Sequence, residues 1–182
     1  YEMQRSLVGS EMCIRDSEGG IREPMIVRWP GTVQPGTRCN DYLIIEDFYP
    51  SILEMAGIDD YDVPQEIDGI SFVPLLKQTK NHSQGRSLYW NCPNIWGEKG
   101  PGIGPSCTIR KDNWKMIYFY ETGEKELYDI PNDTEENNNV AALYPQIINK
   151  LSKELGKFLR QTNGQRPSFK KTGKPCPWPD EI

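Results

Sequence analysis

The stretch CTIRKDNWKMIYFYETGEKELYDI, residues 107–130, decides the fold of the carboxyl-terminal half of the chain. Three short apolar-rich runs, at residues 107–110, 114–120 and 126–130, have the length and composition that are typical of β-strands. The tripeptide KDN and the tetrapeptide ETGE separate them and are turn sequences. The pattern therefore predicts three antiparallel strands in a meander.

Residues 145–161 predict a helix that covers one face of this sheet. Apolar residues recur there at helical spacing, while Lys and Glu occupy the other face. The apolar stripe consists of Ile147, Ile148, Leu151, Leu155, Phe158 and Leu159. A small sheet needs such a cover to hide one face from water. We therefore predict an α+β subdomain, an antiparallel sheet with one packed helix.

The part of the chain before this subdomain has the pattern of the end of an α/β domain. Residues 25–29 (MIVRW) are short, apolar and closed by Pro-Gly, which predicts a buried strand. Asp47 then precedes a run of apolar residues at helical spacing that ends at Gly57. Residues 87–90 are a further candidate strand, followed by a long Gly/Pro-rich loop at 91–106.

These patterns predict four segments along the chain. Residues 1–17 (YEMQRSLVGSEMCIRDS) resemble translated sequencing-adaptor text, and we expect them to be non-native and the true beginning of the protein to lie upstream. They have no apolar core of a signal peptide. Residues 18–80 are expected to end the α/β domain, residues 81–162 to form the α+β subdomain, and residues 163–182 to form an extended tail.

Composition excludes several classes of function. The net charge of −5 argues against a general nucleic-acid binder, which would carry a basic face. No apolar run is long enough for a membrane span. The five cysteines include no C-x-x-C pair, so a zinc site is not expected. A bridge from Cys92 to Cys107 is one alternative, and free or buried thiols are favoured over it.

The residues alone indicate no catalytic site. The single histidine, His82, lies in a polar loop, where an exposed role is favoured over that of a general base. The acidic stretch at 59–62 lacks the Gly and Glu positions of a calcium loop, so a solvated loop is expected there. The glycine-rich residues 100–104 precede no helix pattern, which excludes a phosphate-binding loop.

Five blocks of sequence, read in order, carry a resemblance. They are EGGIREPMIVRWPG at 18–31, EDFYPSIL at 46–53, DGISFVPLL at 68–76, IRKDNWKMI at 109–117, and ELYDI at 126–130 with Asp133, Glu135, Glu136 and Asn137. In this order they resemble the sulfatase family, which belongs to the alkaline-phosphatase-like superfamily. The resemblance covers residues 18–160, and its details are most similar to bacterial sulfatases of sulfated polysaccharides.

The resemblance implies an alkaline-phosphatase-like α/β fold, represented here by its last strand and helix and by the α+β subdomain. It implies hydrolysis of sulfate esters, with a sulfated saccharide as the substrate partner. Family members use formylglycine, made in a C/S-x-P-x-R motif, and calcium held by Asp and Asn. Their active-site lysine stands five residues before the E-G-G glutamate, where this chain has Cys13.

The chain carries none of these groups, so we expect it to hold no catalytic residue and no metal ligand, to bind no cofactor and to be inactive alone. It is expected to be a carboxyl-terminal fragment of a sulfatase. Two alternatives stay open: a non-catalytic carbohydrate-binding or interaction module, and a fragment of a related phosphoesterase. The resemblance to polysaccharide sulfatases implies a periplasmic or secreted protein.

Three residues of the 91–106 loop are candidates for a substrate rim. Asn91, Asn94 and Trp96 combine amide hydrogen-bonding groups with an aromatic face, which together suit a sugar ring. The family resemblance places this loop, after a strand of the S-L-Y-W type, at the substrate entrance. The alternative, that Trp96 covers the small sheet, stays open.

Overall fold

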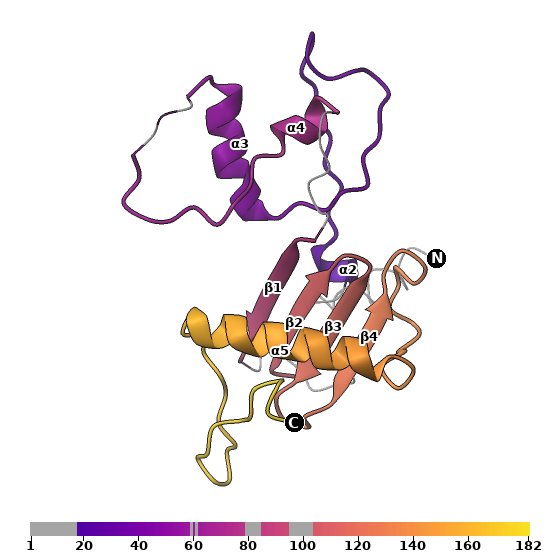
Figure 1. Ribbon diagram of the computed structural model, residues 1–182, viewed down its shortest axis with the longest axis vertical. Coiled ribbons are helices and arrows are strands. Elements are labelled where there is room, and N and C mark those ends of the chain that lie inside the picture. The colour runs from indigo at the N-terminus through magenta and orange to yellow at the C-terminus, as the bar shows by residue number, and fades with distance from the viewer. Residues whose placement is uncertain (1–17, 59, 61, 79–84, 95–103) are drawn as a thin grey trace, which may run out of the picture. The chain divides into compact units, whose positions relative to one another are not determined.

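The computed structural model describes residues 18–58, 60, 62–78, 85–94 and 104–182 (Figure 1). They form two compact units. One unit is Pro24–Arg86, and the other combines the described residues up to Glu23 with Ser87–Ile182. The predicted domain boundaries after residues 17, 80 and 162 stay predictions, whereas the compact units divide at residues 23 and 86.

The larger unit is built on a four-stranded antiparallel sheet. Its strands are β1 (Ser87–Cys92), β2 (Ser106–Lys111), β3 (Trp114–Phe119) and β4 (Lys125–Asp129), in the spatial order β1-β2-β3-β4. The three strands predicted from residues 107–130 are confirmed within a residue or two at each end. The candidate strand at 87–90 pairs with β2 and supplies the fourth strand, with Tyr89 opposite Ile109.

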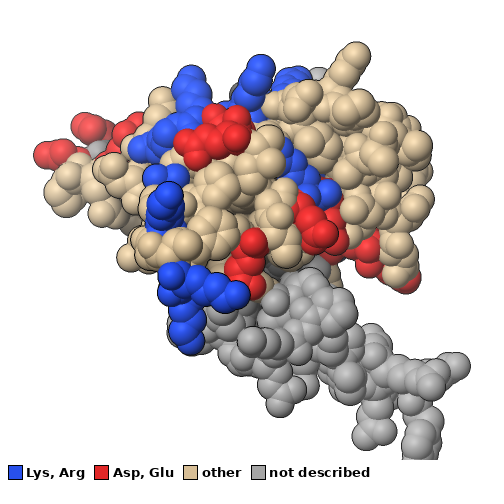
Figure 2. Space-filling model, turned by 90° about the horizontal axis from the view of Figure 1, so that it is seen from below, with Lys and Arg blue, Asp and Glu red and all other residues tan. Residues whose placement is uncertain are grey.

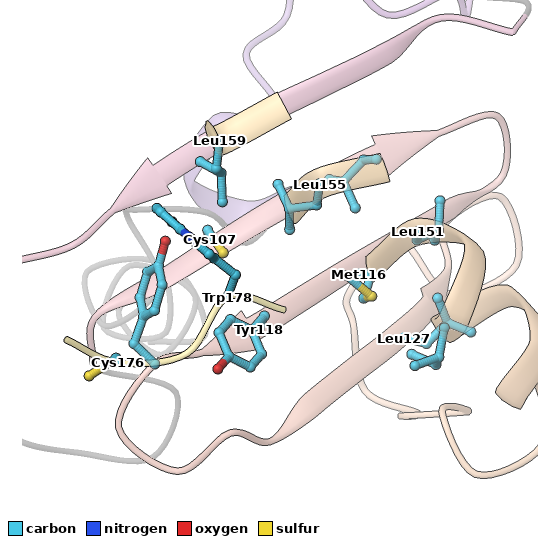
Figure 3. Close-up of a cluster of buried hydrophobic side chains, with 12 residues drawn as sticks. Cys107, Met116, Tyr118, Leu127, Leu151, Leu155, Leu159, Cys176 and Trp178 are labelled. Atoms are coloured by element: carbon cyan, nitrogen blue, oxygen red, sulfur yellow. The ribbon is translucent and has the colours of Figure 1, made fainter. Parts of the chain in front are cut away.

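Helix α5 (Pro145–Gln161) packs across one face of this sheet (Figure 1). Its bounds are those predicted. Ile148, Leu151, Leu155 and Leu159 are buried, and Ile147 and Phe158 pack against the same core. The opposing sheet residues include the register partners Ile109, Met116 and Leu127, which lie on one face because strand side chains alternate. Figure 3 shows several of these side chains between the helix and the strands.

The tail after α5 returns to this core. Cys176 and Trp178 are buried within it (Figure 3). The Tyr118 hydroxyl donates a hydrogen bond of 2.9 Å to the carbonyl of Pro177. No disulfide joins Cys92 to Cys107. This agrees with the favoured prediction that these cysteines remain thiols. In the register Cys107 faces Asn91 and not Cys92, so the two thiols lie on opposite faces of the sheet.

The smaller unit contains η1 (Ile45–Asp47), α3 (Phe48–Met55) and α4 (Val73–Leu76). Helix α3 is the helix predicted after Asp47, and Gly57 follows it with a φ of +71°, the left-handed conformation that ends helices. Gly69 is required by a close approach. An added Cβ there would lie 1.9 Å from the carbonyl oxygen of Glu46, so only glycine lets these two segments touch.

The prediction of a buried strand at residues 25–29 is wrong for this chain. These residues have no regular secondary structure, and Ile26 is 95% exposed. A strand forms only where a neighbouring strand pairs with its backbone groups. The sheet of the described residues consists of β1 to β4, and none of these strands pairs with residues 25–29. An apolar run of this length therefore forms no strand here, because the described residues provide no strand to pair with it.

No helix within the described ranges combines the length and apolar character needed to cross a bilayer.

Candidate functional site

Two neighbourhoods of the larger unit gather charged and polar side chains. The first is a buried cluster of charges on the sheet face opposite α5, which we call the charge cluster: Glu18, Arg110, Lys115 and Glu136. Glu18 begins the short helix α2 (Glu18–Ile21), which is the E-G-G block. Arg110 on β2 and Lys115 on β3 are register partners, so their side chains emerge side by side.

Ion pairs and hydrogen bonds of the charge cluster attach helix α2 to the sheet. Arg110 Nη1 donates to both carboxylate oxygens of Glu18, at 3.0 and 2.8 Å. Lys115 Nζ lies 3.5 Å from Glu18 Oε1. The backbone amide of Glu18 donates to Glu136 Oε2 at 2.9 Å. The first residue of the E-G-G block is thus held by its side chain and by its main chain.

Lys115 is the central cation of the cluster. Its side chain is 0% exposed, and the partner carboxylates of Glu18 and Glu136 are 1% and 7% exposed. Lys115 Nζ approaches Glu136 Oε1 to 2.8 Å as an ion pair, outside the favourable direction for a hydrogen bond. Two cations and two carboxylates balance, which is the condition under which charges are tolerated away from water.

Burial dominates the electrostatics of Glu136. The loss of solvent raises the pKa of its carboxyl group above the ordinary value, and the positive charge of Lys115 opposes this without cancelling it. Lys115 is therefore the group that most strongly opposes this rise in the pKa of Glu136. The carboxylates of the charge cluster pair with cations of the same chain, and the cluster thereby fixes helix α2 to the sheet.

The second neighbourhood is the end of β1, where the predicted rim begins. Asn91 is half-buried and uses both ends of its amide within the chain. Its Nδ2 donates to the carbonyl of Gln165 at 2.8 Å, and its Oδ1 accepts a hydrogen bond of 3.0 Å from Tyr120 Oη. Burial and the adjacent Cys107 raise the pKa of Tyr120, which keeps its phenol protonated as the donor.

The other rim candidates differ in position. Asn94 is exposed. Trp96 lies outside the described residues, as do Cys13 and His82, so their predicted roles stay predictions. Asn91 orients the start of the 91–106 loop through its hydrogen bonds to Gln165 and Tyr120.

The residues present do not fit a calcium ion. Among the described residues, no three His, Cys, Asp or Glu side chains are grouped as metal ligands. The sequence also contains no C/S-x-P-x-R motif that could give formylglycine. The arrangement can hold and orient a segment of backbone, and no step of sulfate-ester hydrolysis is assigned to these side chains.

The convergence of the sequence blocks is the feature that sequence reasoning missed. The resemblance names Glu18, Arg110, Lys115 and Glu136 in three separate blocks, and the structure brings all four together. One signal was available in the sequence. Arg110 and Lys115 are both positively charged, lie five residues apart and flank a tight turn, so they occupy opposite positions of a hairpin. Their need for carboxylate partners could then have been inferred.

A protein-family model described as N-sulphoglucosamine sulphohydrolase, C-terminal, matches residues 16–162. A sulfatase of Formosa agariphila is 27% identical over 175 residues, covering 89% of this chain and 31% of the relative. The Ulvan-active sulfatase of the same bacterium is 29% identical over 175 residues, covering 78% of this chain and 33% of the relative. The chain thus spans about a third of the length of these two relatives.

Solved structures share the fold of the larger part of the chain. The crystal structure of Ps i-CgsB in complex with k-i-k-neocarrahexaose matches with a TM-score of 0.60 at 23% identity, covering 78% of this chain and 29% of that chain. At this identity the likeness concerns the fold alone. It confirms the predicted class, a small antiparallel sheet with a packed helix, as found in proteins of alkaline-phosphatase-like fold.

Proposed function

The chain belongs to the family of the N-sulphoglucosamine sulphohydrolase C-terminal region, a sulfatase family, and from this premise we propose that it is the carboxyl-terminal part of an enzyme that hydrolyses sulfate esters. The observation that carries the proposal is the family match over residues 16–162. The substrate proposed is a sulfated saccharide. The Ulvan-active relative from Formosa agariphila supports this choice.

The role of this chain in such an enzyme is to position the E-G-G segment. The charge cluster clamps Glu18 through Arg110 and through the Glu136 carboxylate. In the family, the active-site lysine stands five residues before this glutamate. A carboxylate held in a fixed direction on a rigid sheet fixes the backbone that precedes it, which is how positioning groups support catalysis at a distance.

The nucleophile and the metal ligands of the proposed enzyme belong to sequence outside this chain. Formylglycine would supply the nucleophile of such an enzyme, and calcium would supply positive charge for the sulfate group. The residues of this chain supply neither group. The same proposal places the enzyme in the periplasm or outside the cell, where sulfated polysaccharides are accessible to bacterial enzymes.

Expression of two forms of the protein tests the proposal. The 182-residue chain alone is expected to release no sulfate from sulfated saccharides. The longer reading frame from the same gene is expected to carry a C/S-x-P-x-R motif, metal-binding aspartates and a lysine five residues before Glu18, and to release sulfate until calcium is chelated. Released sulfate is measured by ion chromatography.

Two results of that experiment would contradict the proposal. One is sulfate release by the 182-residue chain itself. The other is a gene that begins just upstream of Glu18 without these motifs, which would make the chain a free-standing module and move the question to glycan binding. Sequencing the gene through and upstream of the codons for residues 1–17 shows, before any activity is measured, whether the reading frame is the longer one or begins just upstream of Glu18.

The 91–106 loop is proposed to contribute a substrate rim. In the longer enzyme, replacing Asn94 or Trp96 with Ala is expected to raise KM about fivefold with little change in kcat, because a lost hydrogen bond or stacking contact weakens substrate binding by about 1 kcal/mol. Asn91→Ala is the contrasting variant, since its amide bonds Tyr120 and Gln165 and its loss should lower thermal stability. Unchanged saccharide affinity in both rim variants would refute the rim.

A further inference from the structure

Positive charge is concentrated in one short part of the chain. Residues 145–174 contain eight of the 21 Lys and Arg residues and one of the 26 Asp and Glu residues, although the whole chain has a net charge of −5. Figure 2 shows Lys and Arg side chains gathered along one side of a molecular face. A local excess of one sign in an acidic chain creates a field that attracts anions to that surface.

Three of these lysines lie on the solvent side of α5. Lys150, Lys153 and Lys157 are exposed, and their spacing places them on one face of the helix, away from the buried leucines. Over the seven residues from Lys150 to Lys157 the helix advances about 10 Å. The ammonium groups therefore form a row along the helix.

Three more lysines lie on the hairpin that follows α5. Ser168 and Pro175 form a β-bridge, Phe169 N–H donates to the Lys174 carbonyl at 2.8 Å, and Gly173 closes the turn with a φ of +66°. Lys170, Lys171 and Lys174 are exposed on it. In Figure 1 this hairpin projects from the unit beyond the carboxyl end of α5.

The base of the hairpin is fixed to the core. The Arg166 guanidinium lies 4.8 Å from the ring centroid of Trp178, and the amide of Cys176 donates to the Pro167 carbonyl at 2.9 Å. Trp178 and Cys176 are both buried. The lysines of the hairpin are thus presented by a backbone that is held in place, which reduces the entropy lost when a ligand binds.

The six lysines lack carboxylate partners within the described residues. Elsewhere in the unit the buried or half-buried lysines are engaged: Lys111 pairs with Glu154 at 2.8 Å, and Lys115 pairs with Glu136. The neighbouring Arg160 is itself paired with Asp180. The charge available for a ligand is therefore that of the six lysines, which we call the lysine surface.

Aromatic groups lie at both ends of the lysine surface. At one end a shallow hollow of about 440 Å³ is lined by Trp114, Lys111, Asn113 and Lys150, among others. At the other end Phe169 is 38% exposed beside Lys170. Aromatic faces next to cations suit a ligand that has both apolar ring faces and anionic groups.

We infer that the lysine surface binds a sulfated polysaccharide chain as a polyanion. Sulfate groups along the glycan contact the lysines of α5 and of the hairpin, and sugar rings lie against Trp114 and Phe169. The identity of the polyanion rests on the proposed function. Such docking raises the local concentration of substrate near the enzyme.

Direct binding to the 182-residue chain tests the inference. The probe is a fluorescently labelled heparin oligosaccharide, and its Kd is measured by anisotropy at several salt concentrations. The variant Lys153→Glu/Lys157→Glu/Lys171→Glu is expected to bind at least about tenfold more weakly and to show a flatter dependence of log Kd on log salt, because fewer counterions are released.

The matched control carries the same change in charge on the other compact unit. Arg28, Arg38 and Lys77 are exposed there, and the triple change of these residues to Glu is expected to alter the Kd by twofold or less. The desulfated oligosaccharide is expected to bind at least about tenfold more weakly than the sulfated one, since the contacts are ionic.

Two outcomes would overturn the inference. The first is an equal loss of affinity in the lysine variant and in the control, which would mean that overall charge decides binding. The second is equally tight binding of single-stranded DNA of the same charge, which would make the surface a general polyanion site. Neither outcome affects the proposed hydrolysis, which is measured separately as sulfate release by the longer enzyme.

Discussion

Replacement of Lys115 with Met is expected to lower the free energy of unfolding of the larger unit by about 3–5 kcal/mol at neutral pH, because it leaves two buried carboxylates short of a cation. Met fills a similar volume, so the change removes charge with little change in packing. Glu18 and Glu136 would remain, almost fully buried, with Arg110 as the nearest cation of the cluster. Urea unfolding followed by tryptophan fluorescence measures the effect.

The pH dependence of this variant follows from the pKa of Glu136. Burial already raises that pKa, and removing the positive charge of Lys115 raises it further. A carboxyl group whose pKa is raised in the folded state favours folding when protonated and opposes it when ionised. The loss of stability should therefore be largest above the raised pKa and should shrink as the pH falls through it.

Two further variants separate the ion pairs from other effects. Lys153→Met removes an exposed lysine of α5 and is expected to change the unfolding free energy by less than about 0.5 kcal/mol. Adding Glu136→Gln to Lys115→Met removes one unpaired charge and should recover part of the loss, as in a double-mutant cycle. A Lys115→Met protein as stable as the parent at neutral pH would show that the charge cluster does not hold the fold.

Replacement of Asp47 with Asn is expected to unfold the smaller unit locally, with a loss of about 3–5 kcal/mol in its opening free energy. The Asp47 carboxylate is fully buried and accepts two bonds of 2.7 Å from the Arg86 guanidinium. It also accepts the amides of Ile44 and Ile70, at 3.0 and 2.9 Å. An amide in its place would direct an NH₂ group at these donors.

Hydrogen exchange of the backbone amides measures this second effect. In the Asn variant the amides of Ile44 and Ile70 should exchange much faster, while those of β2 and β3 should keep their protection because they lie in the other unit. Asp62→Asn is the matched control, since Asp62 is exposed in the same unit. Equal protection in the Asp47 variant and the control would contradict the role given to Asp47.

Local patterns predicted the elements of the larger unit well. The apolar stripe of residues 145–161 and the turn sequences at 111–113 and 121–124 each lie within a short window, and each specifies its own element through side-chain spacing and backbone preference. The strand predicted at 25–29 failed for the same physical reason. A strand is completed by its neighbour, and the described residues provide none for this segment.

The candidate site was predicted only in part. The sequence blocks contain Glu18, Arg110, Lys115 and Glu136, but none of the four was predicted as a site residue. Asp47 was predicted as the residue before α3, and the structure confirms that place. Its side chain, however, makes no cap hydrogen bond to α3 and instead binds Arg86 and the Ile44 and Ile70 amides. Local sequence does not reveal such a choice, because distant partners compete for the same carboxylate.

The sequence by itself determined the three strands from residues 107–130, helix α5 and the membership of the sulfatase family, since these depend on residue order over short windows. The tertiary structure alone decided that Glu18 meets Arg110, 92 residues away, and Glu136, 118 residues away. Buried charges must find opposite charges wherever the fold brings them. That requirement acts in space, so it leaves no periodic pattern along the chain.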